Sequence, residues 1–205
     1  MPCSITRRRH QIHLQCVAAV CGLLLAVSAQ AEVAGKTGAQ NLSIAAGGQS
    51  PAIVAVAADA GEWEKRAAHD LVDYIRQISG GTPKLADSPD AVAAALAGQA
   101  PLLLVGRVAL GADPSLGTAL AKVAKPDPVL RADAIVLRRQ GNRVYLAGTN
   151  DDSHYYAAAE LLTRWGCRWY LPGPLGECIP RHPALEVGEL DYAYAPPFEV
   201  RRYWL

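Results

Sequence analysis

From residue 51 onward, apolar and polar positions alternate in a way that predicts strands and helices in turn. Residues 52–57 form a short apolar run with β-branched side chains, which indicates a buried strand. Asp59, with Glu62 three positions later, gives a capping-box-like start to a helix. Gly80 and Gly81 end this helix, whose apolar residues recur at helical spacing: Trp63, Ala67, Leu71, Ile75 and Ile78.

Shorter segments continue the alternation as far as residue 123. The pattern predicts a short strand over 83–86, an alanine-rich helix over 89–96 and a weak helix over 116–123. Residues 101–105 are continuously apolar and end at Gly106, which is typical of a central strand.

The second half begins with a predicted hairpin, whose strands over 134–138 and 143–147 are joined by a turn containing Gly141 and Asn142. A helix follows, capped by Asn150 or Asp151 and ended by Gly166; then come a strand over 168–171, a Pro/Gly-rich turn over 172–180 and a last strand over 184–187. The order predicts an α/β (α+β-like) domain, a single-layer mixed β-sheet with helices packed on it.

The N-terminus has the pattern of a secretory signal peptide. Three arginines, 7–9, precede an apolar stretch over 16–27 and the small-residue run 28–31. The apolar stretch is too short to span a bilayer, which takes about 20 residues. We therefore expect a signal peptide over 1–31, cleaved after Ala31, and an exported protein that is periplasmic or secreted. Residues 32–50, rich in Gly, Ala, Gln and Ser, are expected to form a flexible leader before a domain over 51–195.

Composition changes once the signal peptide is set aside. Of 205 residues, 20 are basic and 19 acidic; removing 1–31 takes three arginines and no acid, so the formal net charge becomes −2. That balance argues against a nucleic-acid partner. Two cysteines remain, Cys167 and Cys178, and an exported location permits a disulfide between them. Two free or buried cysteines are the alternative, because their spacing matches no metal or redox motif.

No catalytic, cofactor-binding or metal-binding motif is visible. The sequence contains no nucleophile elbow, phosphate-binding loop, dinucleotide fingerprint or zincin motif. Asp151, Asp152 and His154 crowd a helix N-terminus, where acids cap free N–H groups and complement the dipole. The charged residues of the first long helix are interpreted as its solvated face: Glu62, Glu64, His69, Asp70, Asp73 and Arg76.

Aromatic residues are concentrated late in the chain. Only Trp63 and Tyr74 fall within 32–144, whereas eleven lie between Tyr145 and Trp204. Such a cluster could form a sugar-stacking platform or a packing seam against another domain, and we favour the seam.

The segment GCRWYLPG over 166–173, the turn Leu175-Gly176-Glu177 and the stretch PFEVR over 197–201 are distinctive. Together they resemble the N-terminal domain of bacterial alpha-glucuronidase-like and related glycoside hydrolase-like proteins. The resemblance implies an accessory α/β domain like that preceding the (β/α)8 barrel of hexosaminidase-type and alpha-glucuronidase-type enzymes. The catalytic acids of those enzymes lie on the barrel, so no catalytic residue is carried over to this chain. Residues 196–205 would be the start of a truncated barrel domain.

We therefore expect a non-catalytic accessory domain of an exported glycoside hydrolase-like protein acting in carbohydrate metabolism, whose partner is a downstream barrel in cis. The alternatives are a stand-alone glycan-binding module, for which a polysaccharide or oligosaccharide is the partner, and an interaction domain without a sugar role. The candidate glycan or inter-domain contacts are Trp169, Tyr170, Arg201 and Trp204.

Overall fold

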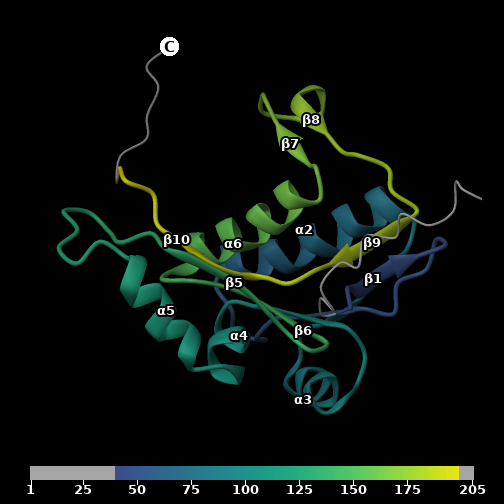
Figure 1. Ribbon diagram of the computed structural model, residues 1–205, viewed down its shortest axis with the longest axis horizontal. Coiled ribbons are helices and arrows are strands. Elements are labelled where there is room, and N and C mark those ends of the chain that lie inside the picture. The colour runs from purple at the N-terminus through teal and green to yellow at the C-terminus, as the bar shows by residue number, and fades with distance from the viewer. Residues whose placement is uncertain (1–39, 199–205) are drawn as a thin grey trace, which may run out of the picture. The chain divides into compact units, whose positions relative to one another are not determined.

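The computed structural model describes residues 40–198, which form a mixed α/β fold (Figure 1). The predicted signal peptide over 1–31, together with Arg201 and Trp204, lies outside these residues. None of the helices within 40–198 is long and apolar enough to cross a membrane.

A six-stranded mixed sheet forms the centre of the fold, in the order β10-β5-β6-β4-β2-β3. Neighbouring strands among β3, β2, β4 and β6 are parallel, and β5 runs antiparallel to both β6 and β10. The strands are β2 (Ile53–Ala55), β3 (Lys84–Ala86), β4 (Leu102–Val105), β5 (Ile135–Gln140), β6 (Arg143–Gly148) and β10 (Asp191–Tyr194).

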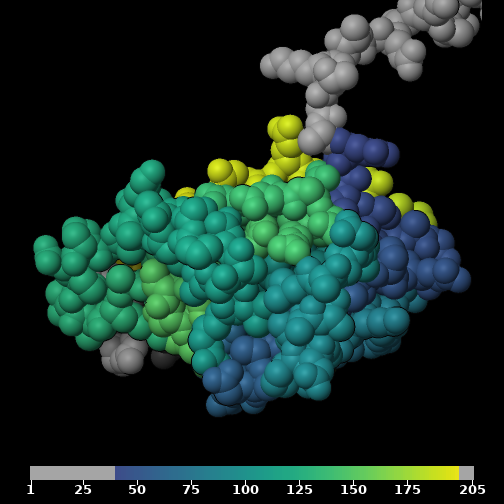
Figure 2. All heavy atoms as spheres, turned by 90° about the horizontal axis from the view of Figure 1, so that it is seen from below, coloured from purple at the N-terminus to yellow at the C-terminus, as the bar shows by residue number. Residues whose placement is uncertain are grey.

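Helices cover both faces of this sheet. On one face, α2 (Glu62–Ser79) and α6 (Asp151–Arg164) bury their apolar residues against alternate strand positions such as Val54, Leu103 and Leu146. The intervening positions face α3 (Pro89–Ala97), α4 (Arg107–Ala112) and α5 (Ser115–Val123). Seen from below, the teal atoms of this second helical layer cover much of the surface (Figure 2). A strand buried on both faces has no polar side to show, which explains the continuous apolar run Leu102–Val105.

The longest predicted helix is present as α2. Ala67, Leu71, Ile75 and Ile78 are buried, as their spacing predicted, whereas Trp63 in the first turn is 46% exposed. Gly80 ends the helix in the left-handed conformation with φ 80°. The expected capping box is wrong, because the N-cap is Gly61 and no side chain of its own segment caps the helix.

The hairpin and the cap of the next helix are confirmed. Gln140 pairs with Arg143 across the two-residue turn, where Gly141 takes φ 58°. The Asn150 side chain accepts a hydrogen bond from the Ser153 N–H at 3.0 Å, so Asn150 is the residue that caps α6.

The described part of the expected flexible leader belongs to the fold instead. β1 (Leu42–Ala46) pairs antiparallel with β9 (Ala184–Val187), and Ile44 and Ala45 are fully buried. The composition of residues 32–50 predicted a flexible segment, because it cannot show that β1 pairs with a strand near the other end of the chain.

A third small sheet replaces the longer strand expected over 168–171. β7 (Arg168–Trp169) pairs with β8 (Glu177–Cys178), and the 3₁₀ turn η1 (Pro174–Gly176) lies between them. Residues 168–178 project from the layer of α2 and α6 and are called the finger below (Figure 1).

Candidate functional site

The finger carries three largely exposed apolar side chains. Tyr170 is 75% exposed, Leu171 66% and Leu175 100%. The Tyr170 N–H donates to the Gly176 carbonyl at 2.9 Å, which closes the tip. A Cβ on Gly176 would lie 2.0 Å from the Leu171 carbonyl oxygen, so only glycine fits this turn. The tip is therefore a fixed turn that presents apolar groups to solvent.

Trp169 attaches the finger to α2. Its indole N–H donates to the Tyr74 hydroxyl at 2.8 Å, and the two rings meet edge to face with centroids 5.5 Å apart. Burial raises the pKa of Tyr74. Since this contact occupies the edge of Trp169 and leaves the ring partly exposed, the tryptophan serves first as the base of the finger.

The two cysteines within residues 40–198 are free thiols in the structure. Cys178 is exposed on β8, whereas Cys167 is buried just before β7. Burial raises the pKa of Cys167 to about 11, which keeps this thiol protonated and unreactive near neutral pH. The disulfide between them stays a prediction.

A second group of side chains lies where the parallel strands end. We call Asp59, Glu64, Arg107, Asp151 and His154 the strand-end cluster. β2 and β6 continue into helices on one face of the sheet, and β4 continues into α4 on the other. In open α/β sheets, ligands commonly bind at the carboxyl ends of the strands where such a change of face occurs.

Glu64 lies at this end of the strands and is buried. Its side chain is 1% exposed; Oε1 accepts the Arg107 backbone N–H at 2.8 Å, and Oε2 accepts the Arg107 Nε–H at 3.3 Å. The Arg107 guanidinium also binds the carboxylate and the carbonyl oxygen of Asp59. A carboxylate from α2 thus caps the first residue of α4.

Asp151 fills the neighbouring position. Its carboxylate accepts the N–H groups of Trp63 and Glu64, at 3.1 and 3.0 Å, and so caps α2 from the start of α6. The fit is close on both sides: a Cβ on Gly61 would lie 2.2 Å from Asp151 Oδ1, and one on Gly106 2.3 Å from Glu64 Oε1. The chain's own carboxylates therefore take the helix N-termini that an anionic ligand would use.

His154 is buried beside these acids. Its Nδ1 accepts the Gly148 N–H at 2.9 Å, which leaves the proton of the neutral ring on Nε2. Burial lowers the pKa of His154; the carboxylates of Glu64 and Asp151 act in the opposite direction, and the Arg107 guanidinium lowers it further.

Of the predicted contact residues, the structure places Trp169 and Tyr170 together on the finger. The solvated-face interpretation of the first long helix is wrong for Glu64, and the capping role expected at the start of α6 extends to α2. Glu64 gave no local signal, since its partner Arg107 is 43 positions away. Within residues 40–198, no group of three His, Cys, Asp or Glu side chains is placed to hold a metal ion.

No family model matches the chain, and no curated protein matches it with significance.

Proposed function

We propose that this chain provides a non-catalytic accessory domain of an exported glycoside hydrolase-like protein in carbohydrate metabolism. In this proposal the finger docks against a barrel-type domain of the same protein. The observation that carries it is the fixed apolar tip formed by Tyr170, Leu171 and Leu175, exposed by 66 to 100%.

The tip is costly unless something covers it. Burying one leucine side chain contributes about 2 kcal/mol, and contiguous exposed apolar groups on a soluble domain mark interaction sites. Leu171 and Leu175 lie on a turn closed by its own backbone hydrogen bonds, so the turn cannot rearrange to bury them without breaking these bonds. A partner surface is the simpler way to bury these side chains.

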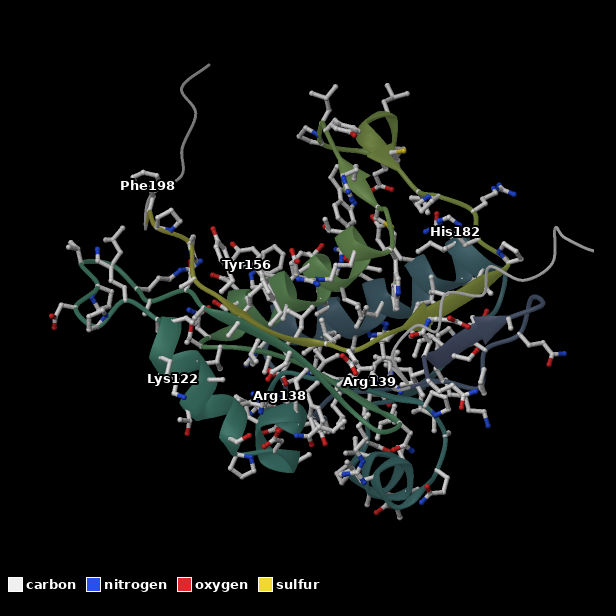
Figure 3. All side chains as sticks on the ribbon, viewed as in Figure 1. Lys122, Arg138, Arg139, Tyr156, His182 and Phe198 are labelled. Carbon is white, nitrogen blue, oxygen red and sulfur yellow. The ribbon has the colours of Figure 1, made fainter. Side chains whose placement is uncertain are left out.

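The path of the chain supports a partner in cis. After β10 the described residues leave the sheet and reach Phe198, which is 70% exposed. Figures 1 and 3, which share one viewing direction, show Phe198 and the finger on the same side of the sheet as α6. A domain that follows residue 198 would be well placed to cover both.

The strand-end cluster supports a structural rather than a catalytic role. Glu64 and Asp151 cap α4 and α2 at the strand ends, where a ligand of an open α/β sheet would bind. A substrate there would have to displace charged side chains that already have partners.

A glycan-binding module remains the second candidate, because Tyr170 presents a largely uncovered ring beside Trp169. Sugars stack on such ring faces. The indole N–H of Trp169 is already used by Tyr74, which leaves Tyr170 as the main platform in that case.

The double variant Leu171→Ser/Leu175→Ser tests the proposal by sedimentation velocity on the full chain. We expect wild-type self-association to rise with protein concentration and to fall in the variant, since two leucines leave the exposed tip. The control is Leu130→Ser, which removes an exposed leucine outside the finger.

Two results would contradict docking by the finger: equal self-association of wild type and double variant, or saturable quenching of tryptophan fluorescence by glucuronoxylan oligosaccharides. The second result, if Tyr170→Ala abolishes it, would establish the glycan-binding module instead.

A further inference from the structure

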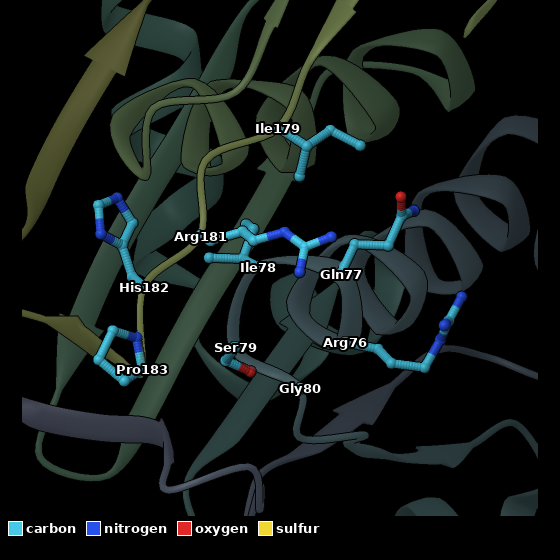
Figure 4. A pocket seen from close by; sticks show the side chains of 9 residues that line it. All are labelled: Arg76, Gln77, Ile78, Ser79, Gly80, Ile179, Arg181, His182 and Pro183. Carbon is cyan, nitrogen blue, oxygen red and sulfur yellow. The ribbon is translucent and has the colours of Figure 1, made fainter.

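An open pocket of about 650 Å³ lies at the far end of α2 from the strand-end cluster. Its wall consists of the last turn of α2, over residues 76–80, and the segment over 179–183 that leads from β8 to β9 (Figure 4). The volume falls within the range of small-molecule sites, about 300–1,000 Å³.

The pocket is lined by basic groups. Arg76, Arg181 and His182 contribute to it, and no carboxylate is among its described lining residues. Among the described residues, Arg76 pairs only with Asp73, at 3.5 Å and with both side chains exposed, which is a weak interaction. Within residues 40–198, Arg181 has neither an ion pair nor a side-chain hydrogen bond. Figure 4 shows its guanidinium extending toward Gln77.

The backbone holds this arrangement in place. The His182 N–H donates to the Ile78 carbonyl at 2.9 Å, and the Pro183 carbonyl accepts the Gly47 N–H at 3.1 Å. A cation in the last turn also complements the helix dipole, which accounts for Arg76. Arg181 belongs to no helix, so the dipole gives no reason for its position.

We propose that this pocket binds a small organic oxyanion, a carboxylate or a phosphate ester. The guanidinium group of Arg181 would receive its charged end, because its forked N–H groups match both oxyanions, whereas Arg76 extends away from it beyond Gln77 (Figure 4). Its uncharged body would lie against Ile179, since Ile78 is buried. This inference is independent of the proposed accessory role, since it involves neither the tip of the finger nor a following domain.

Titration of the ¹⁵N-labelled chain tests the site with three probes of similar size: glucuronate, glucose 6-phosphate and glucose. We expect both anions to shift the amide signals of Gln77, Gly80, Arg181 and His182 in a saturable way, and glucose to leave them unchanged. The anion with the lower dissociation constant shows whether the pocket prefers a carboxylate or a phosphate ester. Arg181→Gln should weaken that binding by about tenfold, the effect of losing a charged hydrogen-bond donor.

The matched control is Arg66→Gln, which removes the same charge from α2 outside the pocket. It should retain the wild-type dissociation constant, and both variants should keep the wild-type circular dichroism spectrum. The proposal is overturned if glucose shifts the same signals as the anions do, if no probe shifts them, or if Arg181→Gln binds as tightly as Arg66→Gln.

Discussion

Glu64 connects two helices that are far apart in the sequence. Its backbone N–H is capped by Asp151, while its own carboxylate caps α4 through the Arg107 N–H. A buried carboxylate is stable only when hydrogen-bond donors surround it. The same residue therefore links the start of α2, through its backbone N–H, to the start of α4, through its carboxylate.

Replacing Glu64 by alanine should lower the free energy of unfolding by about 2–3 kcal/mol, since charged hydrogen bonds and the cap of α4 are lost together. Glu64→Gln keeps an acceptor oxygen for the Arg107 N–H and should cost about 1 kcal/mol. Urea denaturation measures both values.

Glu62→Ala is the control, because Glu62 is exposed in the same turn of α2. It should change the free energy of unfolding by no more than about 0.5 kcal/mol. Equal losses for Glu62→Ala and Glu64→Ala would show that the contacts of Glu64 contribute nothing specific.

His154 should make stability depend on pH. Burial lowers its pKa in the folded chain below the unfolded value of about 6.5, so the unfolded state takes up the proton first. The contribution of the neutral His154 ring to the free energy of unfolding is complete above about pH 6.5. It is lost as the pH falls below that value, by at most about 1.4 kcal/mol per pH unit.

Denaturation of His154→Gln between pH 7 and 5 measures this effect. The variant should lose less stability over that interval than wild type, whereas His69→Gln, on the exposed face of α2, should follow the wild-type curve. A wild-type slope retained in His154→Gln would assign the effect to other groups.

At the scale of elements, sequence succeeds where the signal is local. The spacing of Leu71 and Ile75 predicted α2, and Gly141 predicted the hairpin turn, because each pattern is complete within a few residues. It fails where the stabilising partner is remote. α4 begins at Arg107 under a cap from Glu64, and β1 depends on β9 near the other end of the chain.

The finger is an intermediate case. Its aromatic residues Trp169 and Tyr170 were predicted as contacts, because their setting beside Pro172 and Gly173 is distinctive. The predicted strand over 168–171 is too long, since the turn closed by Gly176 ends the pairing after Trp169. The exposure of Leu171 and Leu175 could not be predicted, because an apolar residue in a short turn has no periodic pattern that indicates whether it faces solvent or the core.

At the scale of the molecule, the two ends of α2 have different surroundings. Its first turn lies in the strand-end cluster, which the chain's own carboxylates fill, and its last turn lines the basic pocket. The finger is held against the middle of the same helix through Tyr74 and Trp169. α2 therefore links the strand-end cluster, the finger and the basic pocket.

Hydrogen–deuterium exchange of the finger tests docking in cis most directly. It compares the 205-residue chain with a protein extended by the proposed barrel domain, over residues 168–178 and over α5 as an internal reference. We predict slower exchange in the finger of the extended protein and unchanged exchange in α5. A finger that exchanges at the same rate in both proteins would contradict docking in cis.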